Sequence, residues 1–334
     1  MADHLNEDVL DHRDQRLIAA LQCDGRLSAE KAGEVLGVSP RTVHRRWRAL
    51  GADGVVRVIG LPTRPDSVGA LLLRIKVLKG KLDAVTAALA ARPDVPFIDL
   101  STSGDEITAV SLTAPGSRDH LVFRQLPATQ AVASVSAATV LHVFAEASDW
   151  RHDVLTADER AALTPQATPP APTIDDAPAP TAGLDPVDRD ILDALRDDAR
   201  APAAAVAART GYPDSTVRRR VARLTENGRL LTQVVVDPRR LGLFIDANLM
   251  MRVPPDHLDK VGRVLAGHPA VHGAFATTGA ANLHAAVWVR GLEDLYRLVT
   301  RDLSGLGVGA VETLLVGQAV KRPGVLTVPL LKTA

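Results

Sequence analysis

Apolar residues near the start of the chain recur at the spacing of an amphipathic helix within 15–22, which predicts a first helix there. Ser28 and Gly37 bound a second predicted helix, 29–36, because serine caps free amides and glycine commonly ends helices. A third helix is predicted to begin at Ser39-Pro40, since the first helical position does not use the N–H that proline lacks. The pattern indicates a compact three-helix unit.

The third predicted helix has one apolar face and one basic face. Val43, Trp47 and Leu50 fall at i, i+4 and i+7, so they share the face that packs on the core. The outward face comprises Arg41, Thr42, His44, Arg45 and Arg48, with Arg46 near the boundary. After Gly54, the β-prone run 55–59 predicts a wing strand. These elements favour a winged helix-turn-helix.

The same pattern returns 174 positions later in the chain. Residues 14–54 align without a gap on residues 188–228, and 13 of the 41 positions are identical. The second copy predicts helices over 189–196 and 202–210, a third helix from about 214, and a wing strand over 230–236. Its outward face comprises Ser215, Thr216, Arg218, Arg219 and Arg223, with Arg220 near the boundary.

A βαββαβ alternation, the ferredoxin-like order, follows each copy. In the first half it predicts strand 70–77, helix 82–90, strands 97–101 and 106–112, helix 117–126 and strand 131–144. In the second half it predicts strand 248–253, helix 258–267, strands 271–277 and 283–289, helix 292–302 and strand 310–320. We therefore predict an α+β chain of two winged helix-turn-helix domains (11–62 and 185–237), each followed by a ferredoxin-like domain (66–150 and 240–330). Residues 156–184, rich in Pro and Ala, are predicted to be a linker.

Composition and charge narrow the functional classes. Formal net charge is zero, yet arginines concentrate in 39–64 and 213–240, where the third helices are predicted, and this is the footprint of a nucleic-acid surface. Aromatic content of 3% is too low for single-strand stacking platforms, which favours duplex DNA. One cysteine, no signal-peptide pattern and no apolar run near the ~20 residues that span a bilayer predict a soluble cytoplasmic protein.

Two complete copies of this arrangement resemble the Lrp/AsnC family of transcription regulators, here in a fused, tandem form. The resemblance rests on the Asp14–Leu21 and Asp188–Leu195 starts, the arginine-bearing third helices, and the glycine pairs 37/211, 69/242 and 104/279. It implies a DNA-binding regulator whose second (RAM-type) domains pair with each other and bind a small effector, often an amino acid. Most members carry one copy, so this chain resembles a dimer joined into one chain, able to assemble further.

The basic helix faces suit the major groove, where arginine can bind guanine O6 and N7. We assign Arg41, Thr42, His44 and Arg45, with Ser215, Thr216, Arg218 and Arg219, to groove contacts. Arg46, Arg48, Arg220 and Arg223 are assigned to phosphates, and the capping Ser39 belongs to the same surface. A solvated basic face is the alternative for one isolated helix; finding it twice favours DNA. The unlike faces predict an imperfect palindrome with unlike half-sites.

The predicted effector site lies at the two glycine turns. It comprises Ser103, Gly104 and Asp105 in the first half and Thr277, Thr278, Gly279 and Asn282 in the second. Turn amides can bind a carboxylate and Asp105 an ammonium group, whereas the second turn has Ala280 and Ala281 instead of acidic residues. Ordinary hairpin turns that need glycine for positive φ are the equal alternative.

Two rival functions remain open from the sequence. Siroheme decarboxylases share the double architecture, but 268–289 holds His272 and His284 with no Tyr or Arg to bind tetrapyrrole carboxylates. A scaffold that no longer binds DNA is the other rival. No nucleotide-binding, nucleophile or metal-spaced motif stands in a proper context, so we expect no enzyme activity, no metal and no cofactor.

Overall fold

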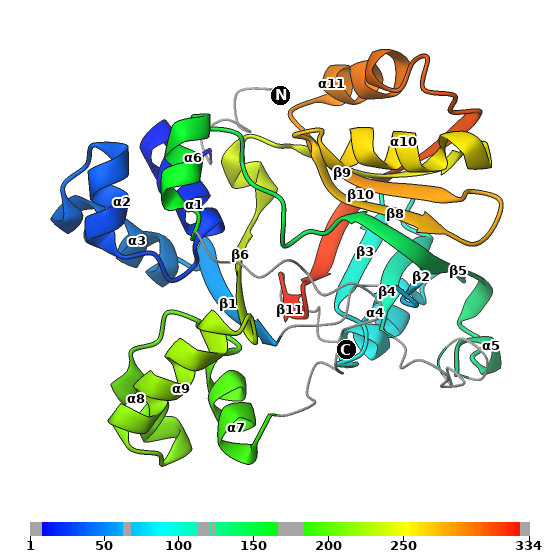
Figure 1. The fold of residues 1–334 in the computed structure, drawn as a ribbon. Helices are drawn as coiled ribbons and strands as arrows, with labels where there is room; N and C mark the ends of the chain where they lie inside the picture. Colours follow the sequence, from blue (N-terminus) through cyan, green and yellow to red (C-terminus); the bar gives the residue numbers. More distant parts are fainter. Residues whose placement is uncertain (1–8, 63–67, 113–120, 122–124, 166–183, 328–334) are drawn as a thin grey trace. The chain divides into compact units, whose positions relative to one another are not determined.

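The computed structural model describes residues 9–62, 68–112, 121, 125–165 and 184–327 (Figure 1). The chain forms two compact units, and each takes residues from both halves of the sequence. Unit one comprises 1–66 and 151–242, and unit two comprises 67–150 and 243–334. The two copies of the three-helix pattern therefore lie together in unit one, and the two βαββαβ segments lie together in unit two.

In the first copy the three predicted helices form close to their predicted bounds: α1 (His12–Cys23), α2 (Ala29–Leu36) and α3 (Pro40–Ala52). Polar side chains cap all three. Asp11, Ser28 and Ser39 each accept a hydrogen bond from a backbone N–H three residues on, so the predicted role of Ser39 as a cap is confirmed. Gly37 ends α2 in the left-handed conformation at φ 67°, which confirms the predicted stop.

The second copy has its own helices and its own core. Its helices are α7 (Pro186–Leu195), α8 (Ala203–Thr210) and α9 (Asp214–Glu226). Val217, Val221 and Leu224 are buried on α9, on the side away from the predicted outward face, and they pack with Ile191 and Leu195 of α7. A separate cluster that includes Leu17, Ala32 and Val43 forms the core of the first copy.

The predicted wing strands are not wings. β1 (Val56–Pro62) and β6 (Leu230–Val236) pair antiparallel with each other along their whole length, from Val56 opposite Val236 to Pro62 opposite Leu230. A wing would return as a hairpin to its own three helices, whereas each of these strands pairs with the other copy. Figure 1 shows the two strands side by side. This two-stranded sheet joins the copies within unit one.

The predicted linker begins too early. α6 (Ala157–Leu163) is a helix inside the range predicted as linker, and it packs on α1 and α2. Thr156 and Glu159 form a capping box, and Leu163 is buried in the core of the first copy. Most of the remaining predicted linker, 166–183, lies outside the described residues.

Unit two contains two ferredoxin-like sheets. The first half supplies β2 (Leu71–Val77), α4 (Leu82–Ala90), β3 (Phe97–Ser101), β4 (Glu106–Ser111), α5 (Leu126–Ala128) and β5 (Val132–Ala145). The strand order β3-β4-β2-β5 is that of a split βαβ unit. The second helix predicted for this half, 117–126, falls mostly outside the described residues.

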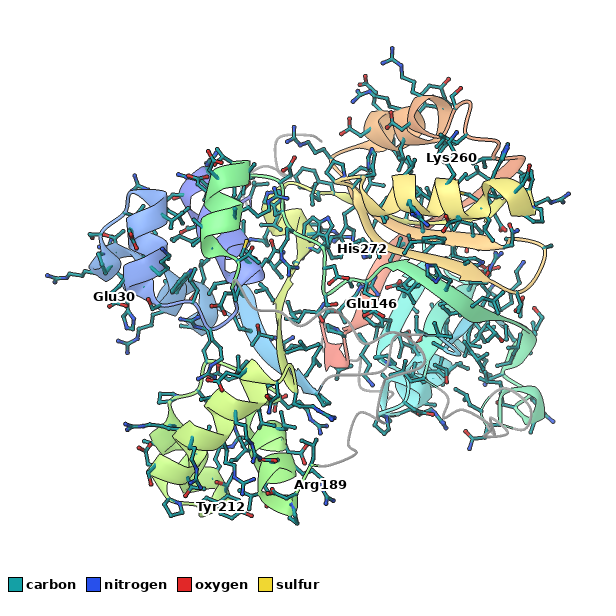
Figure 2. The ribbon with its side chains drawn as sticks, viewed as in Figure 1. Glu30, Glu146, Arg189, Tyr212, Lys260 and His272 are labelled. Carbon is teal, nitrogen blue, oxygen red and sulfur yellow. The ribbon has the colours of Figure 1, made fainter. Side chains whose placement is uncertain are left out.

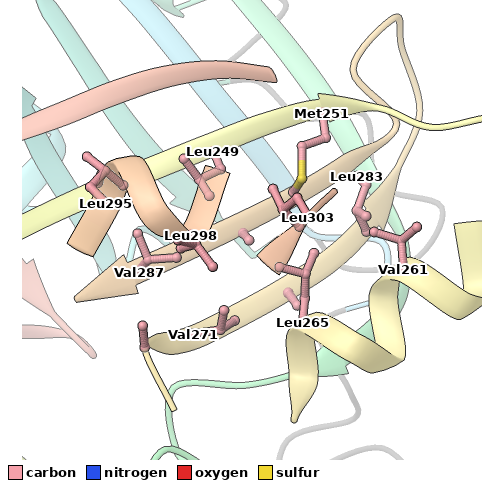
Figure 3. Close-up of a cluster of buried hydrophobic side chains, with 14 of the residues drawn as sticks. Leu249, Met251, Val261, Leu265, Val271, Leu283, Val287, Leu295, Leu298 and Leu303 are labelled. Atoms are coloured by element: carbon pink, nitrogen blue, oxygen red, sulfur yellow. The ribbon is translucent and has the colours of Figure 1, made fainter. Parts of the chain in front are cut away.

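The second half repeats this order as β8-β9-β7-β10. After the short η3 (Pro238–Leu241) of unit one, its elements are β7 (Ile245–Arg252), α10 (Pro255–Ala266), β8 (Val271–Thr277), β9 (Leu283–Val289), α11 (Leu292–Arg297), η4 (Leu298–Asp302), β10 (Ala310–Arg322) and β11 (Val325–Leu326). Buried Leu249, Val261, Leu265, Val287 and Leu298 pack the helices onto one face of this sheet (Figure 3).

The two longest strands join the two sheets. The first part of β5 pairs with β2, and its last residues, Val140 to Ala145, pair with β8 of the second half. β10 behaves in the same way, because 310–315 pairs with β7 and 316–321 pairs with β3 of the first half. The pairings close into a circuit, since β10 contacts both β3 and β7. The halves of this chain therefore pair with each other in both units.

Candidate functional site

The outward face of α3 is exposed as its sequence predicts. Arg41, His44, Arg45 and Arg48 are exposed, and Thr42 is half-buried. The Thr42 hydroxyl lies 2.9 Å from Ser39 Oγ, so both hydroxyls are engaged at the start of the helix. Four side chains are therefore free of the core and able to reach a ligand from this face.

The outward face of α9 is exposed in the same way. Ser215, Arg218 and Arg219 are exposed, and Thr216 is half-buried. Arg218 Nη2 lies 2.6 Å from Asp214 Oδ2 one turn earlier, and this exposed pair contributes little to stability. The two helices thus present basic, polar faces at matching positions of the repeat.

Three of the arginines assigned to phosphates are held by carboxylates within the protein. Arg46 Nη1 lies 2.8 Å from Asp11 Oδ2 and 2.7 Å from Asp14 Oδ1, and the hydrogen bonds that it donates to Asp14 and Asp11 raise its pKa. In the second copy Arg220 pairs with Asp185 and Asp188, and Arg223 Nη2 lies 2.6 Å from Asp188 Oδ2. These contacts fasten each third helix to the first helix of its copy; their role at phosphates stays a prediction.

The first glycine turn is exposed and has a carboxylate held by a neighbour. Gly104 has φ +74°, and Ser103, Gly104 and Asp105 are all exposed. Ser103 Oγ donates to Asp105 Oδ1 at 2.5 Å and lies 2.6 Å from Ser101 Oγ. The Gly104 N–H donates to Ser101 O at 3.1 Å, so the group that the turn presents to solvent is the Asp105 carboxylate.

The second glycine turn has its polar groups bound within the protein. Asn282 donates through Nδ2 to Val253 O and accepts at Oδ1 from Val253 N–H, so both ends of its amide are hydrogen-bonded within the protein. Thr277 is buried and donates to Ala281 O, and Thr278 Oγ1 accepts from the N–H of Thr139 in β5. These groups stabilise the turn and its contact with the first half.

Sequence reasoning missed a buried charged cluster in unit two. Arg322 of β10 forms ion pairs with Asp99 of β3 and, at 3.2 Å, with Asp246 of β7. Burial raises the pKa of Asp99 to about 6, with Asp246 adding to the rise and Arg322 opposing it. A charged residue on a strand is ordinarily expected to face solvent, so the sequence pattern gave no sign of this cluster. The cluster ties the two halves together.

Two aromatic residues and a histidine lie in the same unit. His272, labelled in Figure 2, stacks on Trp288 with ring centroids 3.8 Å apart, and Trp150 meets Trp288 edge-on at 4.9 Å. Burial lowers the pKa of His272 well below its ordinary value, so the ring is held neutral. His272 Nε2 and Trp288 Nε1 have no hydrogen-bond partner among the described residues.

Neither a metal centre nor a membrane span is found in the described parts of the chain. No three His, Cys, Asp or Glu side chains there are grouped so that they could hold a metal ion. None of the helices described is long and apolar enough to cross a membrane.

Comparisons with known proteins match both kinds of domain. The AsnC-type helix-turn-helix domain matches residues 10–50 and again 184–225, and the Lrp/AsnC ligand binding domain matches 246–326. The HTH-type transcriptional regulator PH0140 of Pyrococcus horikoshii is 31% identical over 140 residues, which are 41% of this chain and 89% of the relative. The chain belongs to the Lrp/AsnC family.

Other relatives of this Lrp/AsnC protein agree. The HTH-type transcriptional regulator FL11 of Pyrococcus horikoshii is 27% identical over 134 residues, covering 40% of this chain and 89% of its own length. The match places the chain among transcription regulators with a helix-turn-helix and a ligand-binding domain.

Solved structures of a siroheme decarboxylase match nearly the whole length of the chain. The siroheme decarboxylase NirDL has 17% identity and a TM-score of 0.56, with 92% of this chain and 92% of that chain covered. At this identity the likeness shows the fold alone. It extends over both halves, whereas the two regulators cover only about two fifths of the chain.

Proposed function

We propose that the chain is two Lrp/AsnC regulators fused in tandem, which bind duplex DNA as an intramolecular pseudo-dimer. The observation that carries this proposal is the pair of exposed, arginine-bearing faces on α3 and α9, at matching positions of two family-matched helix-turn-helix domains. The cross-copy strand pairs in both units support it, because they do within one chain what dimerisation does between two. Assembly of several chains into larger homo-oligomers is part of the proposal.

In this proposal α3 and α9 each enter a major groove. Arg45 and Arg219 read base edges, because they are exposed and are identical between the copies. Arg41, Thr42 and His44, with Ser215, Thr216 and Arg218, complete the two unlike faces. Arg48 contacts phosphate, since it is exposed farther along α3. The sites bound are imperfect palindromes with unlike half-sites.

The ligand-binding domains take a small metabolite such as an amino acid. The turn at Ser103, Gly104 and Asp105 is the better candidate, because all three residues are exposed and the Asp105 carboxylate can bind an ammonium group. At the second turn the amide of Asn282 and the hydroxyls of Thr277 and Thr278 are already bound within the protein. We therefore propose one functional effector site in the first half.

Binding selection on fragmented genomic DNA, repeated with a panel of amino acids, tests this function. With a selected duplex, Arg45→Ala and Arg219→Ala should weaken binding and relax base preference. Arg48→Ala should weaken binding on all sequences and lower the slope of log affinity against log salt by about one. Equal losses on every sequence for all three variants would contradict the base-reading assignment.

The fold likeness to NirDL favours one second candidate function, a siroheme-decarboxylase-like enzyme. The buried His272 lies on β8 and the partly buried His284 lies on the neighbouring strand β9, both in unit two. This candidate predicts tight binding of an iron tetrapyrrole with a shifted absorbance band, and loss of the shift in His272→Phe. No spectral change on titration with an iron uroporphyrin, together with binding of selected DNA, would decide for the regulator.

A further inference from the structure

The turns between the first and second helices of the two copies lock into each other. In the first copy the turn is Asp24-Gly25-Arg26, and in the second it is Asp198-Ala199-Arg200. Asp24 Oδ1 accepts from Arg26 N–H at 2.8 Å, and Asp198 Oδ1 accepts from Arg200 N–H at 2.9 Å. The two turns therefore share one backbone hydrogen bond, and each carries an arginine at the same position.

Each arginine donates to backbone carbonyls of the opposite turn. Arg200 Nη1 donates to Gly25 O at 2.7 Å, and Arg200 Nη2 donates to Leu27 O at 3.0 Å. Arg26 Nη1 donates in turn to Ala199 O. These carbonyl groups lie in turns, outside the regular hydrogen bonding of a helix, and a carbonyl that is shielded from water needs such a donor. The two arginines therefore form a reciprocal clamp between the copies.

The paired strands add backbone contacts to this clamp. Ala199 N–H donates to Val58 O of β1 at 2.7 Å, and Gly25 N–H donates to Thr232 Oγ1 of β6 at 3.2 Å. A Cβ on Gly25 would lie 2.5 Å from Thr232 Oγ1, so only glycine fits this approach. Each turn is thereby seated on the strand of the other copy.

Only one of the two arginines, Arg200, contacts a third helix, and that helix is α3. The Arg200 guanidinium carbon lies 4.7 Å from the centre of the Trp47 ring on α3, and Trp47 Nε1 donates to Leu17 O at 3.1 Å. Val221 occupies the position of Trp47 in the second copy, so Arg26 meets no aromatic ring there. Arg200 therefore contacts α3 through the Trp47 ring and holds the turn before α2 through two carbonyl bonds, whereas the contact of Arg26 with the other copy is one carbonyl bond to Ala199.

We propose that Arg26 and Arg200 are positioning residues, which fix α3 relative to α9 and so set one separation of the two half-sites in DNA. This inference rests on the proposed DNA-binding function. Neither arginine lies on a recognition helix. They determine which spacing between the two half-sites is bound, whereas the outward faces of α3 and α9 determine which bases are read.

A distance measurement tests the clamp without DNA. Spin labels attached to Ala49→Cys and Ala222→Cys, both exposed, report the separation of α3 and α9 by pulsed electron resonance in a Cys23→Ala background. We expect a narrow distance distribution in the otherwise wild-type chain, a markedly broader one in Arg200→Ala, and a smaller broadening in Arg26→Ala. Arg200→Lys keeps the charge but not the two-pronged donor, so it should not restore the narrow distribution.

Binding to duplexes in which the two half-sites are moved apart tests the consequence. The wild-type chain should lose at least ~10-fold in affinity when the spacing changes by about half a helical turn, because one half-site then faces away. Arg200→Ala should reduce this discrimination to about 3-fold or less while keeping its affinity for an isolated half-site. Circular dichroism of each variant confirms that the helices remain folded.

The two measurements distinguish a failure of the clamp from a failure of the proposed DNA-binding function. An unchanged distance distribution in both alanine variants overturns the clamp. A broadened distribution with an unchanged spacing profile overturns its role in DNA selection. If no duplex is bound by the wild-type chain, the proposed function fails, and the distance measurement alone decides whether the arginines hold the helices.

Discussion

Replacing Gly60 by alanine tests the pairing of the two copies in unit one. Gly60 lies on β1, and its N–H donates to Arg196 O at 3.1 Å. A Cβ added there would lie 2.7 Å from Leu195 O, at the end of α7 of the other copy, where ordinary contacts begin at 3.4 Å. The missing distance is 3.4 − 2.7, or about 0.7 Å, and the atom in the way is backbone.

This overlap cannot be relieved by a side-chain rotation, so Gly60→Ala should cost about 2–3 kcal/mol, as other overpacking substitutions do. Gly51→Ala is the matched control, because Gly51 lies within α3 with nothing within 4 Å of an added Cβ. It should stabilise the protein by about 0.5–1 kcal/mol, since glycine is a poor helix former.

Urea unfolding followed by Trp47 fluorescence measures both effects in unit one, once Trp150 and Trp288 of unit two are replaced by phenylalanine. At a slope of about 2 kcal/mol per M, the expected loss lowers the urea midpoint by about 1–1.5 M. If β1 were a free wing, Gly60→Ala would be neutral or stabilising. A midpoint equal to or above that of the parent chain would refute the cross-copy pairing.

Two further substitutions test other contacts. Leu163→Ala should cost about 2–4 kcal/mol, since it empties a buried position on α6, and a change below about 0.5 kcal/mol in urea unfolding would show that α6 does not pack on the first copy. In unit two, burial lowers the pKa of His272, so the unfolded state binds more protons below the ordinary value of 6.5 and stability is lost as pH falls through that value. When the pH is lowered from about 7.5 to 5.5, the His272→Phe variant should therefore lose less stability in thermal unfolding than the parent chain does. An identical loss in both proteins would contradict a buried, neutral His272 ring.

The sequence predicts helices and strands well where the residues that determine them lie within the segment itself. The helix 29–36 and the strands 97–101 and 271–277 form with the predicted bounds, because caps, glycines and apolar spacing lie within each segment. The Ser39-Pro40 start is confirmed for the same reason.

The errors arise where a distant partner decides the structure. The run 55–59 becomes a strand as predicted, but its partner is 230–236 of the other copy, and no local pattern encodes that register. α6 did have a signal, since Thr156 and Glu159 have the spacing of a capping box, but the proline-rich composition that follows hid it.

Some features of the candidate site could likewise be predicted from the sequence, and others could not. The exposed faces of α3 and α9 follow from helical spacing, because Val43 and Val217 must face their cores. The pairing of Arg46 with Asp14 and of Arg220 with Asp188 does not, since it depends on how the third helix crosses the first. The clamp of Arg26 and Arg200 depends on contacts between copies, which identity of the two arginines alone does not reveal.

Selection of bound duplexes from random DNA, with the number of chains per duplex counted by native mass spectrometry, tests whether one chain binds two half-sites. We expect two unlike half-sites at one spacing, bound by the outward faces of α3 and α9 of a single chain. Two identical half-sites that require two chains, or no enrichment of any sequence, would contradict it.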